Sequence, residues 1–157
     1  MKNVIIDLSK NLKTIIVKED SCVYALLVPE ENGVYKNKFS VLFKKSGLTA
    51  KLLIKIVLLG SSEITLEPNI VISRNLKDID CELKVECLTD TNDSKLKVTP
   101  SMEVANPNVK VKHSLSISTF DDNQINYLLS RGLSKIRTRK LLIDGFVDDI
   151  ISKIEQE

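Results

Sequence analysis

Apolar and polar side chains alternate with a period of two from residue 3 to about residue 118. The alternation runs through segments that read NVIIDL, KTIIVK, CVYALLV, KFSVLFK, AKLLIKIVLL, EITLEPNIVIS, DCELKVECL, KLKVTPSMEV and VKVKHSLSIS. Successive side chains of a β-strand point to opposite faces, so each segment predicts a strand with one buried face. Turn residues such as Gly33, Gly47 and Gly60 separate many of these segments.

The repeat length restricts the fold to a few β-rich architectures. Strand and turn together recur about every ten to twelve residues, which fits a β-sandwich, a β-barrel or a β-solenoid. The aromatic content is only 4% and the chain has no Trp, so we expect a core of Ile, Leu and Val. Alternation and composition leave the three architectures open.

Beyond Asp121 the pattern becomes typical of helices. One helical face carries Ile125, Leu128 and Leu129, and Gly132 stands where a C-terminal cap belongs. Ser134 is suited to cap a second helix, whose inward residues we expect to be Ile136, Thr138, Leu141, Leu142, Phe146, Ile150 and Ile154. Helices of this length need a surface to pack on. We therefore expect one domain over residues 1–157, with a β body over about 1–119 and helices over about 120–157.

Length and charge restrict the classes of partner. A chain of 157 residues can bury one hydrophobic core. Its net charge of +2 gives no basic footprint for nucleic acid, and its longest apolar run, Leu52–Gly60, is too short to span a bilayer. We expect neither a nucleic-acid nor a membrane partner. The N-terminal apolar run is too short for a signal peptide, so we expect a cytoplasmic protein with reduced thiols at Cys22, Cys81 and Cys87.

The usual signatures of an enzyme are missing from the sequence. The five glycines are scattered and form no phosphate-binding loop. His113 is the only histidine, and no G-x-S-x-G motif accompanies it. The few aromatic residues do not suit a polysaccharide-cleaving groove. We predict that the protein is not an enzyme.

Several short motifs recur in a recognisable order near the C-terminus. Pro100 is followed by Met102-Glu103-Val104, His113 stands ten residues after Glu103, and the runs Tyr127–Gly132 (YLLSRG) and Gly145-Phe146 come after it. In this order and spacing, the stretch 100–154 resembles the end of the SUF iron–sulfur cluster assembly scaffold family, the SufB/SufD core. The match is that of a short, SufD-like member.

The resemblance implies a fold and a function. The implied fold is a mainly β, right-handed parallel β-helix (β-solenoid) with a C-terminal helical cap. The implied function is that of a non-catalytic scaffold component in iron–sulfur cluster assembly, which pairs with itself as a homodimer or with a SufB-like subunit and a SufC-like ATPase. A transient iron–sulfur cluster or iron is the implied cargo. The alternative is a structural or interaction β-helix module that has lost the cluster site.

The sequence departs from the family pattern around the histidine. In SufD-like members the histidine stands in a Cys-Ser-His-Gly-Ala run that follows paired acids, whereas His113 stands in Val-Lys-His-Ser-Leu. SufB-like members carry a Cys about six residues before the proline, where this chain has Ser94. Full-length members also carry an N-terminal helical region that we do not find here. Transfer of the fold is therefore better supported than transfer of the activity.

His113 is the candidate metal ligand, because neutral imidazole binds iron and other transition metals. The alternative is a structural histidine on an apolar strand face. Glu103 matches the family glutamate, with an ordinary strand residue as the alternative. Cys81 and Cys87 lie roughly 20 Å apart along one strand, too far to bind one ion, and are interpreted as small buried hydrophobic residues.

The remaining charged residues have structural interpretations. Arg131 is suited to the last carbonyls of its helix or to a carboxylate of the β body. The run Arg137–Lys140 is interpreted as a solvated helix face, with partner docking as the alternative. The lysines of the middle strands, namely Lys44, Lys45, Lys51 and Lys55, are interpreted as residues that protect sheet edges.

Overall fold

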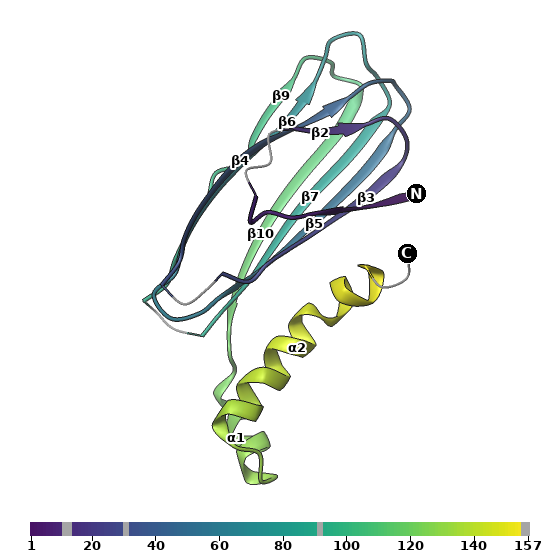
Figure 1. Ribbon diagram of the computed structural model, residues 1–157. Coiled ribbons are helices and arrows are strands. Elements are labelled where there is room, and N and C mark those ends of the chain that lie inside the picture. Colours follow the sequence, from purple (N-terminus) through teal and green to yellow (C-terminus); the bar gives the residue numbers. More distant parts are fainter. Residues whose placement is uncertain (11–13, 30–31, 91–92, 155–157) are drawn as a thin grey trace.

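The computed structural model describes residues 1–10, 14–29, 32–90 and 93–154. In this part of the chain ten strands are followed by two helices (Figure 1). They are β1 (Lys2–Ile6), β2 (Thr14–Val17), β3 (Ser21–Leu27), β4 (Val34–Phe43), β5 (Thr49–Leu58), β6 (Glu63–Ile72), β7 (Ile79–Thr89), β8 (Lys95–Val98), β9 (Ser101–Val104), β10 (Val109–Thr119), α1 (Asp122–Ser130) and α2 (Lys135–Ile154).

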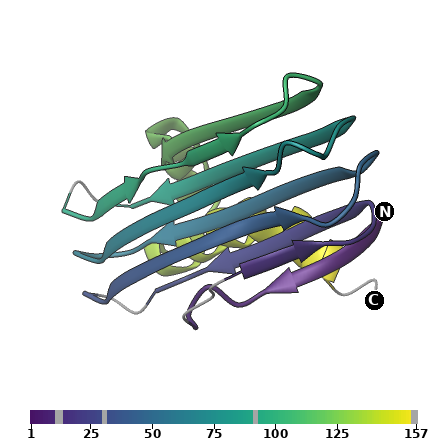
Figure 2. The same ribbon diagram turned by 90° about the horizontal axis from the view of Figure 1, so that it is seen from above.

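The strands alternate between two facing sheets. One sheet has the order β1-β3-β5-β7-β10, and the other has the order β2-β4-β6-β8 with β9 also paired to β6. Every strand pair is parallel, and Figure 2 shows the turns stacked one beside the next. The arrangement confirms the predicted parallel β-solenoid with a C-terminal helical cap and excludes the sandwich and the barrel.

Nine predicted strand segments became ten strands because one of them is interrupted. The segment 95–104 forms β8 and β9, and Thr99 and Pro100 lie between them. The gap lies opposite Glu67 and Pro68 of β6, and neither Pro68 nor Pro100 has a backbone N–H to donate between the strands. Both short strands pair with β6, at Glu63–Leu66 and at Asn69–Ile72.

The core consists of inward side chains stacked in register from one turn to the next. One such ladder in the first sheet joins Val4, Val23, Leu52 and Leu83. Val23, Leu52 and Leu83 are almost completely buried. Because each rung is covered by the rung of the neighbouring turn, mainly aliphatic side chains fill the space between the sheets. The aliphatic core was predicted correctly, although Phe39 and Phe43 also lie in it.

The two helices begin and end as the local sequence indicates. The Asp121 side chain accepts a hydrogen bond from the backbone N–H of Asn123 (2.8 Å) at the start of α1. Gly132 follows α1 with φ +88°, a conformation that costs glycine little. The Ser134 hydroxyl accepts a hydrogen bond from the Arg137 N–H (3.4 Å) at the start of α2, as predicted.

The predicted inward face of α2 is correct only in part. Thr138 and Ile150 are buried, and Leu142 and Phe146 are half-buried. The prediction is wrong for Ile136 and Leu141, because their side chains are 83% and 50% exposed. Figure 1 shows that α2 begins beside α1, away from the sheets, and then runs back toward them, so its N-terminal apolar residues are exposed. The side chain of Ile154 lies outside the described residues. None of the described helices is long and apolar enough to cross a membrane.

Replacement of Leu83 tests whether the ladders carry the stability. Leu83 is 1% exposed and sits between rungs on both neighbouring strands. We expect Leu83→Ala to lower the free energy of unfolding by about 2–5 kcal/mol, because it leaves a cavity. Urea denaturation followed by circular dichroism measures this. The matched control is Ile136→Ala on exposed α2, expected to change the free energy by less than about 0.5 kcal/mol. Equal effects of the two variants would contradict the ladder as the stabilising element.

Candidate functional site

The last turn of the solenoid leaves its inner face open. Met102 and Val104 on β9 are 43% and 42% exposed, and Leu115 and Ile117 on β10 are 45% and 56% exposed. We call these four residues the open-end patch. Their register partners one turn earlier are Ile70, Ile72, Val85 and Cys87, and each of those is at most 2% exposed. The patch therefore has the side chains of a core rung without the turn that covers one.

The strand that borders the patch also has a free edge. β10 pairs with β7 over its whole length, from Val109 to Thr119, and among the described residues no strand pairs with its other side. Such an edge presents unpaired N–H and C=O groups that favour the addition of another strand. A strand edge and an apolar surface thus coincide at the C-terminal end of the solenoid.

His113 lies on β10 within this open end. It pairs in register with Leu83 and so occupies the next rung of the ladder formed by Val4, Val23, Leu52 and Leu83. Unlike those core residues, His113 is exposed. Within the described ranges, no group of three His, Cys, Asp or Glu residues is placed to hold a metal ion. A ligand role for His113 remains a prediction.

The structure separates Glu103 from His113. Glu103 pairs with Val71, between two inward positions of β9, and accepts a hydrogen bond from the Asn69 amide nitrogen (2.6 Å). Its carboxylate is therefore held on the outer face of one sheet, whereas His113 occupies an inward position of the other. Ser94, where SufB-like members carry a Cys, hydrogen-bonds the Thr89 hydroxyl (2.7 Å between the oxygens).

Two cysteines are part of the core. Cys81 and Cys87 are buried in β7, in register with Ala50 and Ile56 of the neighbouring strand. Burial raises the pKa of both thiols to about 12, and the nearby Asp80 carboxylate adds to the effect at Cys81. A thiol of that pKa is almost entirely protonated at neutral pH and is a poor nucleophile and metal ligand. The interpretation as small buried hydrophobic residues is confirmed. Cys22 is half-buried and free.

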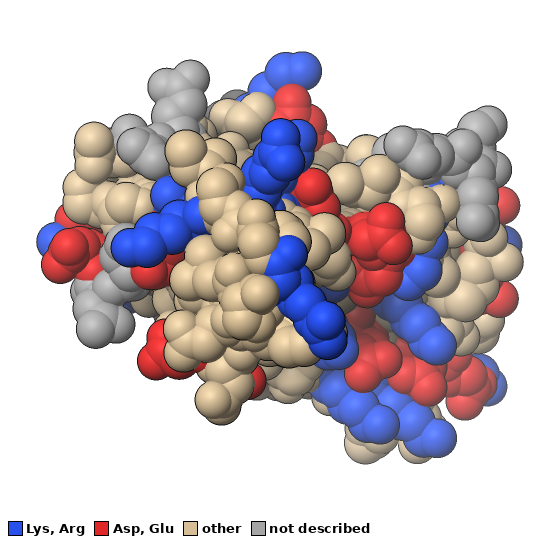
Figure 3. Space-filling view, turned by 90° about the horizontal axis from the view of Figure 1, so that it is seen from below, with Lys and Arg blue, Asp and Glu red and all other residues tan. Residues whose placement is uncertain are grey.

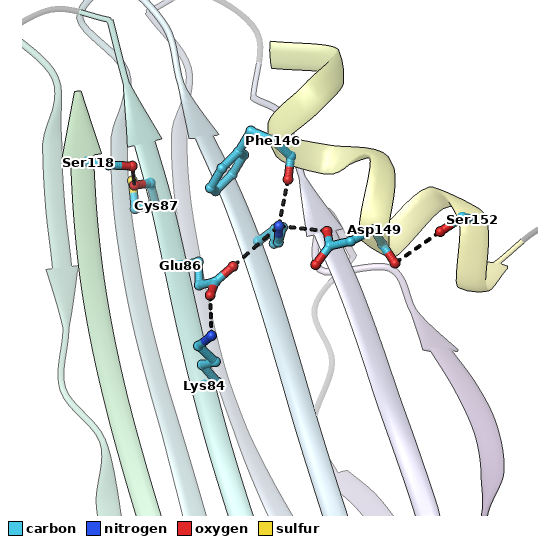
Figure 4. Close-up of polar contacts among 8 residues, drawn as sticks. Lys84, Glu86, Cys87, Ser118, Phe146, Asp149 and Ser152 are labelled. Carbon is cyan, nitrogen blue, oxygen red and sulfur yellow. Dashed lines mark hydrogen bonds and ion pairs between the residues drawn. The ribbon is translucent and has the colours of Figure 1, made fainter. Parts of the chain in front are cut away.

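The sheet-edge interpretation is wrong for Lys51 and Lys55, which both lie on the central strand β5, and Lys55 is the one that is buried. It belongs to β5, a central strand between β3 and β7, and is 6% exposed beneath α2. Its ammonium group lies 2.6 Å from Asp149 Oδ1 and 3.3 Å from Glu86 Oε2. It also donates to the Phe146 carbonyl oxygen (2.6 Å) and lies 4.5 Å from the centre of the Phe146 ring. Figure 4 shows Glu86, Asp149 and Phe146 converging there, so Lys55 joins α2 to the sheet.

The charges around Lys55 compensate one another. Burial raises the pKa of Glu86, but hydrogen bonds from Lys84 and Lys55 lower it by more, so its pKa lies below the ordinary value. Glu86 is thus charged at neutral pH, where its contribution to stability is fully present. That contribution is lost as the pH falls through the lowered pKa. The lone Lys in the apolar run 52–59 was the only sequence signal for this cluster.

The helices present a second exposed apolar surface, with basic residues beside it. Tyr127 on α1 and Ile136 and Leu141 on α2 are at least half exposed, and Arg137 and Lys140 are exposed on the same helix turns. We call these five residues the helical patch. Figure 3, which views the molecule from its helical end, shows blue basic side chains bordering a tan area.

The interpretation of Arg137–Lys140 as a solvated helix face is correct only for its two ends. Thr138 is buried and Arg139 forms an ion pair with Asp90. Arg131 stacks over the Tyr127 ring of its own helix, 5.2 Å from the ring centre. Its backbone N–H donates to the carbonyls of the last turn of α1. Arg131 thus has a structural role, but its side chain acts through the Tyr127 ring rather than through the predicted contact with the helix carbonyls or with a carboxylate of the β body.

By its fold the protein belongs to the class of parallel β-solenoids. It has two sheets, C-terminal helices and an open last turn. The family follows from comparison with known sequences: the model of the SUF system FeS cluster assembly, SufBD core domain, matches residues 9–146. The match covers most of the chain, and the chain belongs to this family. It confirms the resemblance over residues 100–146 and extends it back to residue 9, so that β1 lies outside the match.

Individual relatives match shorter stretches. An iron–sulfur cluster assembly SufBD family protein of Porphyra purpurea is 34% identical over 64 residues, which are 41% of this chain and 13% of that protein. A protein of the same description from Mycobacterium leprae is 38% identical over 65 residues, or 41% of this chain and 17% of the relative. A third such protein, from Staphylococcus saprophyticus, is 26% identical over 84 residues, which are 54% of this chain and 18% of that relative. The matched stretches thus span less than a fifth of the length of these three relatives.

Removal of the Lys55 ammonium group tests its role in docking α2. We expect Lys55→Met to destabilise the docked helix by about 1–3 kcal/mol, because it leaves Glu86 and Asp149 without their shared partner. Amide hydrogen exchange in α2 is then expected to accelerate about tenfold or more, with less change in the central strands. The matched control is Lys51→Met, an exposed lysine on the same face of β5. Unchanged exchange in α2 of the Lys55 variant would contradict the role assigned here.

Proposed function

We propose that this protein is a non-catalytic scaffold component of iron–sulfur cluster assembly that pairs through the open end of its solenoid. Family membership supports the assembly role. The open-end patch supports the pairing, because a core-like rung is left uncovered there beside the free edge of β10. Its occupant is a second copy of this chain or a SufB-like subunit.

Pairing at this end satisfies two physical demands together. A strand added to β10 supplies partners for its free N–H and C=O groups. The apolar side chains of the incoming turn cover Met102, Val104, Leu115 and Ile117, and removal of that apolar area from water stabilises the complex. At the opposite end of the solenoid the inward residues Ile6, Ile15 and Val17 are at most 9% exposed, which distinguishes the two ends.

His113 is proposed as the residue that contacts the cargo. It occupies an inward rung at the seam, where a second chain brings its own side chains within reach. An imidazole nitrogen is a suitable ligand for iron, and further ligands would come from the partner. The thiols of Cys81 and Cys87 take no part in this scheme, because both are buried with a pKa of about 12.

The helical patch is proposed as the contact for a SufC-like ATPase. It combines exposed apolar side chains with Arg137 and Lys140, so it suits a partner surface that is apolar with an acidic rim. The patch lies on α1 and α2, whereas the open-end patch lies on β9 and β10. Two partners can therefore bind at separate elements.

The two surfaces are distinguished by reciprocal variants. We expect Ile117→Lys to weaken self-association, or binding to a SufB-like subunit, at least about tenfold, since it buries an unpaired charge in the seam. Ile136→Glu is expected to leave that pairing unchanged and to weaken binding of a SufC-like ATPase. Analytical ultracentrifugation and titration calorimetry measure both. Pairing that survives Ile117→Lys unchanged would contradict the open-end interface.

The cargo role of His113 is tested by anaerobic reconstitution with iron and sulfide in the presence of the pairing partner. We expect a visible-absorbing chromophore that His113→Ala weakens, because the imidazole ligand is lost. The control is Ser114→Ala, the next residue of β10, which faces the other way and is expected to leave the chromophore unchanged. If pairing is intact and absorbance is independent of His113, the ligand role is refuted and the structural module becomes the better description.

A further inference from the structure

The edge strand β10 carries two different rows of side chains. The inward positions hold Val109, Val111, His113, Leu115, Ile117 and Thr119, and the outward positions hold Lys110, Lys112, Ser114, Ser116 and Ser118. Every residue of the strand from Lys112 onward is exposed. In the outward row, both basic residues lie in the first half of the strand and all three serines lie in the second half.

A second copy of this chain can add its own β10 to this edge in one orientation only. Because both copies offer the same edge, the two strands are related by a twofold axis. An axis along the strands makes them parallel but turns the inward face of one copy outward. An axis perpendicular to the sheet makes them antiparallel and keeps both inward faces on one side. Only the antiparallel pair therefore joins the apolar rungs of the two copies into one surface.

The register of this pair follows from strand length and from the alternation of side chains. Opposite residues of an antiparallel pair point to the same face, so inward residues oppose inward residues. β10 has eleven residues. Pairing all of them places Val109 opposite Thr119 of the second copy and centres the pair on Ser114. A shift of two residues in either direction keeps the faces matched but leaves one end of each strand without a partner.

The charges favour the same register. When the pair is centred on Ser114, Lys112 lies opposite Ser116 of the second copy, and Lys110 lies opposite Ser118. Each lysine then faces a neutral hydroxyl. A register centred on Lys112 would instead place two ammonium groups opposite each other, which is destabilising. Strand length and charge thus select one register independently.

This register brings the two copies of His113 together. Each His113 lies opposite Leu115 of the other copy, so the two histidines are diagonal neighbours on the inward face. Diagonal neighbours in an antiparallel pair are roughly 7–8 Å apart, within reach of aromatic side chains. Two imidazole rings at this separation can bind one ion between them. Within the described part of a single chain, no group of three His, Cys, Asp or Glu residues could hold a metal, so this site is complete only in the pair.

We propose that two copies of the chain pair through β10 in the register centred on Ser114 and that their His113 side chains bind a divalent transition-metal ion such as Zn²⁺. This rests on the open-end pairing proposed above and specifies its self-paired form. Imidazole nitrogen is a good ligand for Zn²⁺, and water fills the remaining positions of the ion. Because the ion binds the pair and not the single chain, it favours self-pairing by mass action. A SufB-like subunit that uses the same edge then competes with the metal-bound pair.

Disulfide cross-linking tests the register. The chain carries Cys22→Ser, which removes the half-buried free thiol. We expect Ser114→Cys to form a disulfide-linked dimer under mild oxidation, because opposite Cβ atoms are about 4.5–5.5 Å apart, close to the separation that a disulfide needs. The matched control is Ser116→Cys, which is equally exposed on the same face and is expected to stay unlinked. A mixture of Ser116→Cys and Lys112→Cys chains is expected to cross-link, since these positions oppose each other.

Sedimentation of the unmodified chain with and without Zn²⁺ tests the metal site. We expect Zn²⁺ to lower the dissociation constant of the pair about tenfold or more, whereas Mg²⁺, which prefers oxygen ligands, has no effect. His113→Ala is expected to pair in the absence of metal and to lose the response to Zn²⁺. Ser116→Ala, an exposed residue of the same strand, is the control and is expected to keep the response.

Three results would overturn this inference. They are a Ser116→Cys chain that cross-links as well as Ser114→Cys, a His113→Ala pair that Zn²⁺ strengthens as much as the unmodified pair, and a chain that does not associate with itself. If such a chain still binds a SufB-like subunit and Ile117→Lys weakens that binding, the open-end pairing stands and only the self-paired metal site is lost. Pairing that ignores Ile117→Lys contradicts the open-end interface itself.

Discussion

In-register stacking of parallel turns is the constraint on which the rest of this structure depends. Each inward side chain is covered by the equivalent side chain of the next turn, as in the ladder from Val23 through Leu52 to Leu83. The last rung of such a stack has no following rung, so it needs a cap or a partner to cover it. The exposure of Leu115 and Ile117 is thus a direct consequence of the way the core is built. The proposed interface therefore follows from the in-register stacking of the turns and needs no special sequence motif.

The strands were predictable because their signal is local. Alternation within a strand and turn residues between strands depend only on near neighbours. The break at Pro100 was not predicted, because a proline need not interrupt a strand, as Pro68 within β6 shows. The choice of a solenoid over a sandwich depends on which strands pair, and only the family resemblance indicated it. Burial on the outer face was not predictable for the same reason. Lys55 is buried because α2 returns to cover β5, and Ile136 is exposed because the first turn of that helix extends past the sheet.

Sequence analysis identified one residue of the candidate site, His113, but not the open-end patch that surrounds it. His113 was selected by its place in the family motif, and the structure adds that it extends a core ladder into an exposed position. The apolar members of the open-end patch resemble core residues in sequence, because the period-two pattern is the same in a covered turn and in the last one. Glu103 shows the reverse case. Its sequence position matched the family glutamate, and strand parity and the hydrogen bond from Asn69 hold its side chain on the outer face of the sheet.

The open end and the helical cap are linked through a single strand. β10 forms the free edge at one side of the seam, and only Phe120 and the capping Asp121 separate it from α1. From there α2 runs back to β5, where Lys55, Glu86 and Asp149 hold it. Glu86 belongs to β7, the strand that pairs with β10 along its whole length. A partner that pairs with β10 therefore contacts a strand whose neighbour, β7, carries Glu86, one of the residues that hold α2 on the sheet. The strand-pairing surface and the helical surface are thus positioned by one continuous set of contacts.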